Sequence, residues 1–297
     1  MSALPPALDA ERFEIDTPAG RVSAYRAWPQ SGAANLPPVL LVHSVNASGS
    51  AAEVKPMFEH CRRRRAVYAL DLPGFGFSDR SDRVYTPRLM TDAIHAMLAH
   101  MRAAHGVEAI DVLGVSLASE FVVRAQQEAP HTVRRMALVS PTGFSGPKRR
   151  YGPPGSTLFQ AWLFKILSWP FWSEGIYRNL TRPAVIRYFL ERTWGSKRID
   201  EALWRYDVIT TRQPGARFAP LHFVAAGMFS RDINSLYEAV TCPVWVSMAT
   251  RGDFTDYQGK VTVEQRPNWQ FHAIEGGALP YFEDLAAFTD KLDPFWG

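Results

Sequence analysis

The stretch from Ile110 to Phe121, I-D-V-L-G-V-S-L-A-S-E-F, constrains the fold of this chain more than any other. It reads as a short apolar strand, a turn of small residues with Ser116 at its tip, and the start of a helix. Gly114 and Ala118 stand where larger side chains would crowd so sharp a turn. A serine raised above a strand end, close to the N–H groups of a helix start, is accessible to a ligand. As a bare pattern, G-x-S-x-A predicts a structural turn as readily as a nucleophile.

Buried strands alternate with helices around this turn. Unbroken apolar runs at residues 39–43 and 66–71 are typical of strands that are covered on both faces of a parallel sheet. Residues 87–104 place apolar side chains at the spacing of one helix face, and another strand is expected at 136–139. Residues 12–27 predict an antiparallel hairpin at the sheet edge. The order predicts an α/β fold, a mainly parallel sheet with helices on both faces.

The alternation breaks down after Gly143 and resumes at Pro243, with further strands expected at 243–248 and 269–274. We therefore expect residues 143–236 to form a helical insertion over the sheet. Residues 1–142 and 237–297 should together form the α/β core.

The composition limits the function classes. The hydrophobic fraction of 46% and the charged fraction of 21% are ordinary for a soluble globular protein. The two cysteines, Cys61 and Cys242, are far apart, which indicates a reducing compartment without disulfides. The N-terminus shows no signal-peptide pattern, so we expect a cytoplasmic protein. Basic and aromatic residues are not interleaved, and no metal or dinucleotide motif is present, so we expect no nucleic acid, metal or cofactor.

The order of these features resembles the α/β-hydrolase superfamily over nearly the whole chain. The matching pieces are L-L-V-H-S, D-L-P-G-F-G-F-S-D, G-V-S-L-A, the helical insertion and G-G-A-L-P-Y-F-E-D, each after the expected strand. The resemblance implies the α/β-hydrolase fold, with an eight-stranded, mainly parallel sheet and the insertion acting as a lid over the substrate pocket.

The resemblance also implies roles by position. Ser116 matches the nucleophile, and the N–H groups of Leu117 and Val45 match the oxyanion donors. Asp253, in the loop after the seventh strand, matches the acid of the catalytic triad, with Asp256 as the less favoured choice. The glycine that usually follows the histidine of L-L-V-H is here Ser44, which alters the oxyanion loop.

The chain departs from the family at the catalytic base. Family members generally read G-x-G-H-x-P-x-x-E, and the residue at the histidine position, five before Glu283, is Ala278. A serine hydroxyl needs a base to take its proton, and the same base later protonates the leaving group.

Three interpretations follow. In the first, the protein is an enzyme with a base from elsewhere, for which His43, His222 and His272 are candidates, although each is also explained as a structural residue. In the second, it is a non-hydrolytic protein, either a catalytically inactive ligand-binding protein or an enzyme whose chemistry needs only a polarising pocket. In the third, Ala278 is an engineered inactivating change in an ordinary hydrolase.

The insertion is unusually aromatic over residues 158–172, a stretch shorter than a membrane span and interrupted by Lys165. We expect this aromatic stretch to line an apolar substrate pocket. The alternatives are that it contacts a membrane surface or that it only packs against the core. The pocket candidates are Trp162, Phe164, Trp169 and Trp172. The sequence thus predicts a hydrolase that cleaves an ester or a carbon–carbon bond in a small, largely apolar molecule. The alternative is a protein that only binds such a molecule.

Overall fold

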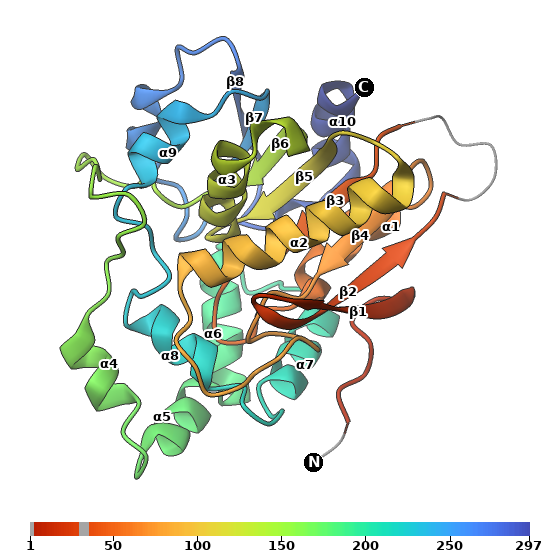
Figure 1. Cartoon of the computed structure of the whole chain (residues 1–297). Coiled ribbons are helices and arrows are strands. Elements are labelled where there is room, and N and C mark those ends of the chain that lie inside the picture. Colours follow the sequence, from red (N-terminus) through yellow and green to blue (C-terminus); the bar gives the residue numbers. More distant parts are fainter. Residues whose placement is uncertain (1–2, 30–35) are drawn as a thin grey trace.

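Eight strands form one twisted sheet at the centre of the molecule, in the order β1-β2-β4-β3-β5-β6-β7-β8 (Figure 1). The computed structural model describes residues 3–29 and 36–297, so residues 1–2 and 30–35 of the predicted core lie outside it. The strands are β1 (Glu11–Thr17), β2 (Gly20–Ala27), β3 (Val39–Val42), β4 (Val67–Leu70), β5 (Ile110–Val115), β6 (Val133–Val139), β7 (Val244–Ala249) and β8 (Trp269–Ile274). The hairpin β1–β2 is antiparallel and β2 also pairs antiparallel with β4, whereas all other pairs are parallel. This confirms the predicted fold class.

Helices cover both faces of the sheet and fill the segment between β6 and β7 (Figure 1). They are α1 (Lys55–Cys61), α2 (Pro87–His105), α3 (Ala118–Glu128), α4 (Ala161–Leu167), α5 (Ser173–Leu180), α6 (Pro183–Trp194), α7 (Glu201–Thr210), α8 (Phe218–Val224), α9 (Ile233–Ala239) and α10 (Leu285–Trp296), with short 3₁₀ turns that include η1 (Ala51–Val54) and η4 (Pro280–Phe282). No helix of the described residues is long and apolar enough to cross a bilayer. The cytoplasmic location stays a prediction.

The unbroken apolar runs are explained by two separate cores, because successive side chains of a strand point to opposite faces. On β3, Leu40 and Val42 face the core that is formed with α2, α3 and α9. Val39 and Leu41 face the second core, which is formed with α1 and α10. Every residue of β3 is buried, as the sequence predicted.

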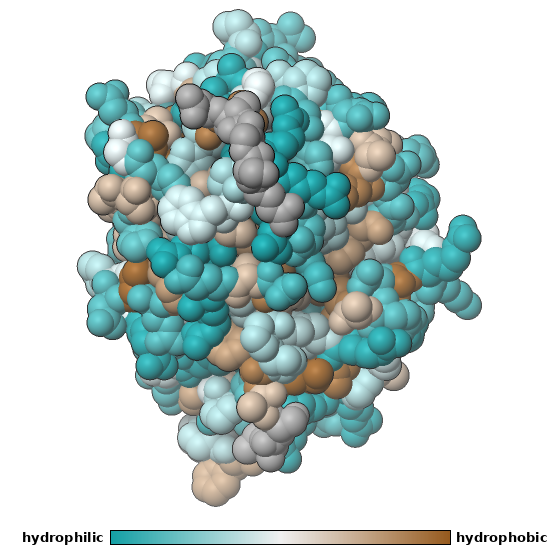
Figure 2. Space-filling model, turned by 90° about the vertical axis from the view of Figure 1, so that its right-hand side faces the viewer, coloured by the Kyte–Doolittle hydropathy of each residue, from teal (hydrophilic) through white to brown (hydrophobic). Residues whose placement is uncertain are grey.

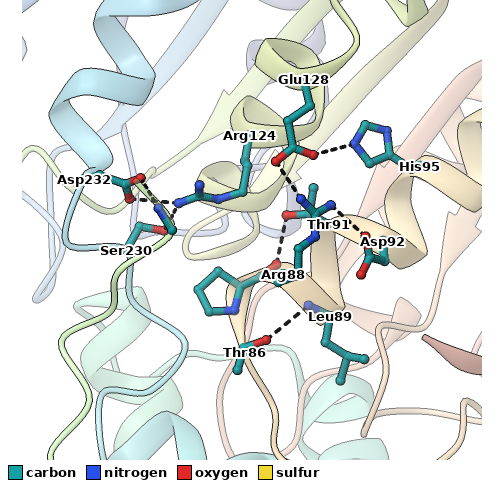
Figure 3. Close-up of polar contacts among 12 residues, drawn as sticks. Thr86, Arg88, Leu89, Thr91, Asp92, His95, Arg124, Glu128, Ser230 and Asp232 are labelled. Carbon is teal, nitrogen blue, oxygen red and sulfur yellow. Dashed lines mark hydrogen bonds and ion pairs between the residues drawn. The ribbon is translucent and has the colours of Figure 1, made fainter. Parts of the chain in front are cut away.

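The helix α2 shows how local signals set an element that supports the site. The Thr86 hydroxyl accepts a hydrogen bond from the N–H of Leu89 at 3.3 Å, and Gly106 ends the helix with a φ of +61° (Figure 3). From its surface, Arg88 and His95 both reach Glu128 at the end of α3 (Figure 3). These contacts fix α2 against α3, the helix that begins behind Ser116.

The helix α3 also anchors both ends of the insertion. The buried carboxylate of Glu120 accepts hydrogen bonds from the Thr142 hydroxyl, before the insertion, and from the Ser230 N–H, near its end, both at 2.7 Å. Arg124 on the same helix pairs with Asp232 at 2.8 Å (Figure 3). The predicted boundary at residue 236 falls inside α9, which packs on α3. The insertion is therefore held to the element that carries Ser116, and its action as a lid stays a prediction.

Candidate active site

Ser116 lies in the sharp turn between β5 and α3. Its φ is +51°, a left-handed conformation that costs a serine on the order of 1 kcal/mol and is found at functional turns. The N–H of Ser116 is bound by the Val139 carbonyl at 2.8 Å, which holds the strained turn against β6. A side chain at Gly114 would approach Val122 on α3 to 3.2 Å, which accounts for the glycine. Such a turn raises the hydroxyl above the carboxyl end of the sheet.

The loop after β3 faces the same end of the sheet. Val45 is buried, and no hydrogen bond among the described residues uses its N–H or that of Leu117. The loop is held from within: the Ser44 N–H and the Asn46 amide donate to the Glu53 carboxylate at 2.8 and 2.6 Å. Two unused N–H groups beside a raised hydroxyl are the arrangement that stabilises a developing oxyanion.

Ser116 opens onto a cavity of about 160 Å³ between the sheet and the insertion. Its walls are mainly aliphatic and aromatic. They are formed by Ser44, Val45, Asn46, Glu53, Val115, Ser116, Leu117, Thr142, Leu190, Thr193, Leu203, Phe223, Phe229, Phe254, Ala278 and Leu279. A wider outer cleft of about 560 Å³ shares Thr142, Phe229 and Phe254 with it, so these three residues stand between the two spaces.

Ala278, at the position that the sequence resemblance assigns to the base, lines this cavity. Its N–H donates to the Thr193 carbonyl of α6 at 2.9 Å, and its carbonyl accepts from the Ser140 hydroxyl at 2.9 Å. A side chain on the neighbouring Gly277 would meet the same Thr193 carbonyl at 2.5 Å. The end of α6 is thus packed directly against the loop that would hold the histidine.

Asp253, the predicted triad acid, lies in the expected loop after β7 but away from the Ser116 cavity. Its carboxylate is bound by Arg192 of α6 at 2.5 Å, its side chain is 42% exposed, and it does not line the cavity. Without an imidazole at position 278 to receive it, the carboxylate is neutralised by the adjacent guanidinium. Asp256, the other choice, is also exposed and caps the N–H groups of Gly146 and Gln258.

None of the three candidate histidines lines the cavity. His43 is fully buried, and burial lowers its pKa to about 4. Its Nε2 accepts from the Leu72 N–H at 3.0 Å, so the proton is on Nδ1, which donates to the Ser44 carbonyl. His43 is therefore a neutral structural residue whose two nitrogens are both engaged.

The other two histidines point elsewhere. His222 lies against Phe164 with 4.1 Å between ring centroids, beside a separate pocket of about 170 Å³. His272 stacks on Trp245 at 5.3 Å, in the core that faces α10. Among the described residues that line the Ser116 cavity, no imidazole is present.

The aromatic residues expected to line the substrate pocket lie outside the Ser116 cavity. Trp162, Trp169 and Trp172 are 65%, 42% and 48% exposed, and Phe164 borders the separate pocket of His222. The reason is the position of α4, which has no buried residue and touches the rest of the molecule mainly through α8. The insertion instead lines the cavity from later helices, with Leu190, Leu203 and Phe223.

A comparison with known proteins identifies the family of this fold. Residues 37–192 match the family model of the α/β-hydrolase fold. The chain belongs to the α/β-hydrolase family. No curated protein matches this α/β-hydrolase in sequence.

Solved structures share the fold over almost the full length. A probable hydrolytic enzyme from Pseudomonas aeruginosa PAO1 is 18% identical, with a TM-score of 0.73, and the match covers 97% of this chain and 94% of that one. A meta-cleavage product hydrolase from Pseudomonas fluorescens IP01 is 15% identical, with a TM-score of 0.68 and coverage of 96% and 97%. An epoxide hydrolase is 17% identical, with a TM-score of 0.73 and coverage of 97% and 99%. Identities this low show the shared fold.

Glu53, which the sequence reasoning missed, is the only acid–base side chain among the described residues that line the cavity of this α/β-hydrolase. It lies in η1, immediately after the oxyanion loop, and its side chain is buried. Burial raises the pKa of the Glu53 carboxyl, against the hydrogen bonds from Ser44 and Asn46 that lower it. A raised pKa makes its carboxylate a stronger base than an exposed one.

A second buried carboxyl, Asp207 of α7, lies near Glu53 across the boundary between core and insertion. Burial is the main cause that raises the pKa of Asp207 well above its ordinary value, and the negative charge of Glu53 is the second cause. A hydrogen bond with Ser48 acts in the opposite direction. Its Oδ1 has no partner within the described chain. Because Glu53 accepts two N–H donors and Asp207 keeps an unbound oxygen, we assign the first ionisation to Glu53. Asp207 then remains protonated beside it.

This pair predicts a pH-dependent stability. A carboxyl whose pKa is raised on folding stabilises the protein fully below its ordinary pKa of 3.8, and this contribution is lost as the pH rises towards the folded value. Asn at position 207 cannot ionise, so the Asp207→Asn variant does not lose stability in this way. Its free energy of unfolding minus that of wild type should increase with pH, by up to about 1.4 kcal/mol per pH unit. Urea unfolding of both proteins at acidic and neutral pH measures the difference. If the free energies of unfolding of the two proteins differ by the same amount at every pH, Asp207 is not held protonated in the folded protein.

The two carboxyls differ in how far the sequence could reveal them. Glu53 follows the oxyanion loop in the sequence S-G-S-A-A-E. The family resemblance places that loop beside the serine turn, so it could also have indicated that Glu53 lies nearby. Asp207 lies in W-R-Y-D-V-I, where only the packing of α7 against η1 shows that the acid is turned inward.

Proposed function

We propose that this chain is a serine-type hydrolase that cleaves an ester or a carbon–carbon bond in a small, largely apolar molecule. The observation that carries the proposal is the shared cavity, onto which Ser116, the oxyanion loop and Glu53 all open. Membership of the α/β-hydrolase family supports the proposal, as do structural neighbours that are themselves hydrolases.

In the first half of the reaction, the Glu53 carboxylate takes the proton of the Ser116 hydroxyl, directly or through one water molecule. The serine oxygen bonds to the substrate carbonyl carbon, and the carbonyl oxygen becomes an oxyanion that the N–H groups of Val45 and Leu117 bind. Negative charge moves from Glu53 to the substrate oxygen, so the cavity never holds both charges. When the oxyanion collapses, the protonated Glu53 gives its proton to the leaving alkoxide or carbanion, and an acyl-serine remains.

Hydrolysis of the acyl-serine repeats these steps with water as the nucleophile. Glu53 takes one proton of the water, the hydroxide oxygen bonds to the acyl carbon, and the serine oxygen leaves with the proton that Glu53 returns. The products are the carboxylic acid and the free Ser116 hydroxyl. Glu53 thus performs both proton transfers that the family histidine performs, and Asp207 is its buried neighbour.

The cavity also limits the substrate. An apolar cavity of about 150 Å³ accommodates a benzene ring, and the cavity here is of similar size, about 160 Å³. We infer that the acyl group is a short chain or a single ring and that the leaving group extends past Phe229 and Phe254 into the outer cleft.

The test is a panel of phenyl esters that differ only in the length of the acyl chain. We expect hydrolysis of acyl groups of about two to six carbons and a loss of at least tenfold beyond about eight, because longer chains exceed a benzene-sized cavity. Equal rates across all chain lengths would contradict the assignment of the acyl group to this cavity.

A ligand-binding protein without catalysis is the second candidate, and a specific observation favours it: the described residues that line the cavity include no imidazole, and Asp253 is bound to Arg192. The same panel separates the two. Saturable binding of short apolar ligands in isothermal titration calorimetry, together with no hydrolysis of any ester, would establish the binding protein.

Ala278→His tests the idea of an engineered loss. We expect less than about a tenfold gain in ester hydrolysis, because the new imidazole would find Asp253 bound to Arg192, and a triad histidine without its acid loses about four orders of magnitude. Ala278→Gln, of similar bulk without a base, is the control for filling the cavity. A gain of a thousandfold or more that is confined to the histidine variant would show an ordinary hydrolase inactivated at this position.

A further inference from the structure

The outer end of the insertion carries a patch of exposed aromatic and aliphatic side chains that we call the aromatic face. Its members come from α4 and from the loop between α4 and α5. They are Trp162 (65% exposed), Ile166 (50%), Trp169 (42%), Phe171 (89%) and Trp172 (48%). Contiguous exposed apolar side chains of this size mark an interaction surface. The structure describes no part of the chain that covers them.

Two features show that the aromatic face presents apolar side chains to solvent. The Trp172 indole N–H is already bound by the Ile166 carbonyl at 2.7 Å, so the ring offers solvent no donor. The opposite side of α4 holds the helix in place through Phe164, which packs on His222 of α8. Figure 1 shows α4 and α5 at the end of the insertion farthest from the sheet. The face in Figure 2, on the other side of the molecule from α4, is mostly hydrophilic with small scattered hydrophobic groups.

The charge around the aromatic face identifies its partner. Residues 159–182, which contain the aromatic face, carry Lys165, Arg178 and Arg182 and one acid, Glu174, a net charge of +2. Lys165 and Arg182 lie within this segment, both exposed and outside any ion pair of the described residues. A single-stranded nucleic acid needs a basic groove along its backbone, but Lys165 is the one cation between residues 159 and 172. Exposed Trp and Phe beside basic side chains fit a bilayer interface with anionic lipids.

We propose that the aromatic face docks this protein onto anionic lipid surfaces, with Trp162 and Phe171 inserted at the headgroup boundary and Lys165 and Arg182 attracted to lipid charge. The rings supply the burial of apolar surface and the cations supply the selectivity for anionic lipid. This docking is independent of the chemistry at Ser116, because none of these residues lines that cavity.

The experiment is co-sedimentation of the full chain with phosphatidylcholine vesicles that do or do not contain about one-third phosphatidylserine. We expect binding to the anionic vesicles, at least tenfold weaker binding to the neutral ones, and a loss of binding as salt rises. Trp162→Ser combined with Phe171→Ser should weaken binding about tenfold or more, and Lys165→Glu combined with Arg182→Glu should remove the preference for anionic lipid. Trp28→Ser, at a half-exposed tryptophan outside the insertion, should bind as wild type does.

The outcomes separate the possible partners. No binding to anionic vesicles, or equal binding by wild type and the Trp162→Ser/Phe171→Ser variant, would overturn the proposal. Tighter binding to a single-stranded oligonucleotide than to vesicles would assign the face to nucleic acid. A dimer in light scattering that this variant abolishes would assign it to a second copy of the chain. Hydrolysis of a water-soluble ester should be unchanged in all these variants, which separates docking from catalysis.

Discussion

Glu53→Gln is expected to lower kcat/KM for hydrolysis of a short phenyl ester by about two to four orders of magnitude. The amide keeps the size of the side chain but does not act as a base, so the Ser116 hydroxyl loses the only acid–base group that the described part of the chain places in its cavity. The Gln side-chain oxygen can still accept from the Ser44 N–H, which preserves that bond of the oxyanion loop, whereas its NH2 group cannot accept from the Asn46 amide. We therefore expect KM for the ester to change little, because the loss falls on the chemical step.

Asp253→Asn is the matched control, since it makes the same change from carboxylate to amide at the position that the family pattern names as the triad acid. Because Asp253 is exposed and bound to Arg192, we expect the rate to stay within about threefold of wild type. A loss of several orders of magnitude in Asp253→Asn, with little effect of Glu53→Gln, would show that the loop after β7 acts in catalysis and that Glu53 is structural.

Ser116→Ala is expected to abolish both ester hydrolysis and labelling by a fluorophosphonate probe. The variant removes one oxygen at the tip of the turn, so the cavity and its apolar walls remain. Binding of a short apolar ligand, measured by isothermal titration calorimetry, should therefore stay within about threefold of wild type, because hydrophobic contacts dominate such a pocket. Mass spectrometry of the labelled protein should place the phosphonate on Ser116.

A second serine provides the control for this result. Ser81 is exposed and lines neither the cavity nor the outer cleft, so Ser81→Ala should label and hydrolyse as wild type does. Residual hydrolysis above background in Ser116→Ala, or a label on another residue, would show that the nucleophile lies elsewhere.

The sequence predicted the parts of this protein that depend on local pattern. The unbroken apolar run at 39–43 predicted a doubly covered strand, and β3 contributes alternately to two cores. The small residues around Ser116 predicted a sharp turn, and the structure shows one with a φ of +51°. These succeed because strand burial and turn geometry are set by neighbouring residues.

The failures concern side-chain direction, which depends on residues far apart in the chain. The aromatic residues of α4 were expected to face the substrate, but a helix that packs through one side leaves the other in solvent, and periodicity does not say which side is which. Asp253 stands in the expected loop, yet Arg192, 61 positions away, binds its carboxylate. Asp207 is buried only because α7 meets η1.

The central claim is that Ser116 is activated by Glu53 and not by an imidazole supported by Asp253. The most direct measurement is the rate at which a fluorophosphonate modifies Ser116, followed by intact mass, because it needs no knowledge of the natural substrate. We predict that Glu53→Gln slows this rate by about a hundredfold or more, while Asp253→Asn leaves it within about threefold. Modification of Glu53→Gln at the wild-type rate, or no modification of the wild-type protein, would contradict the account.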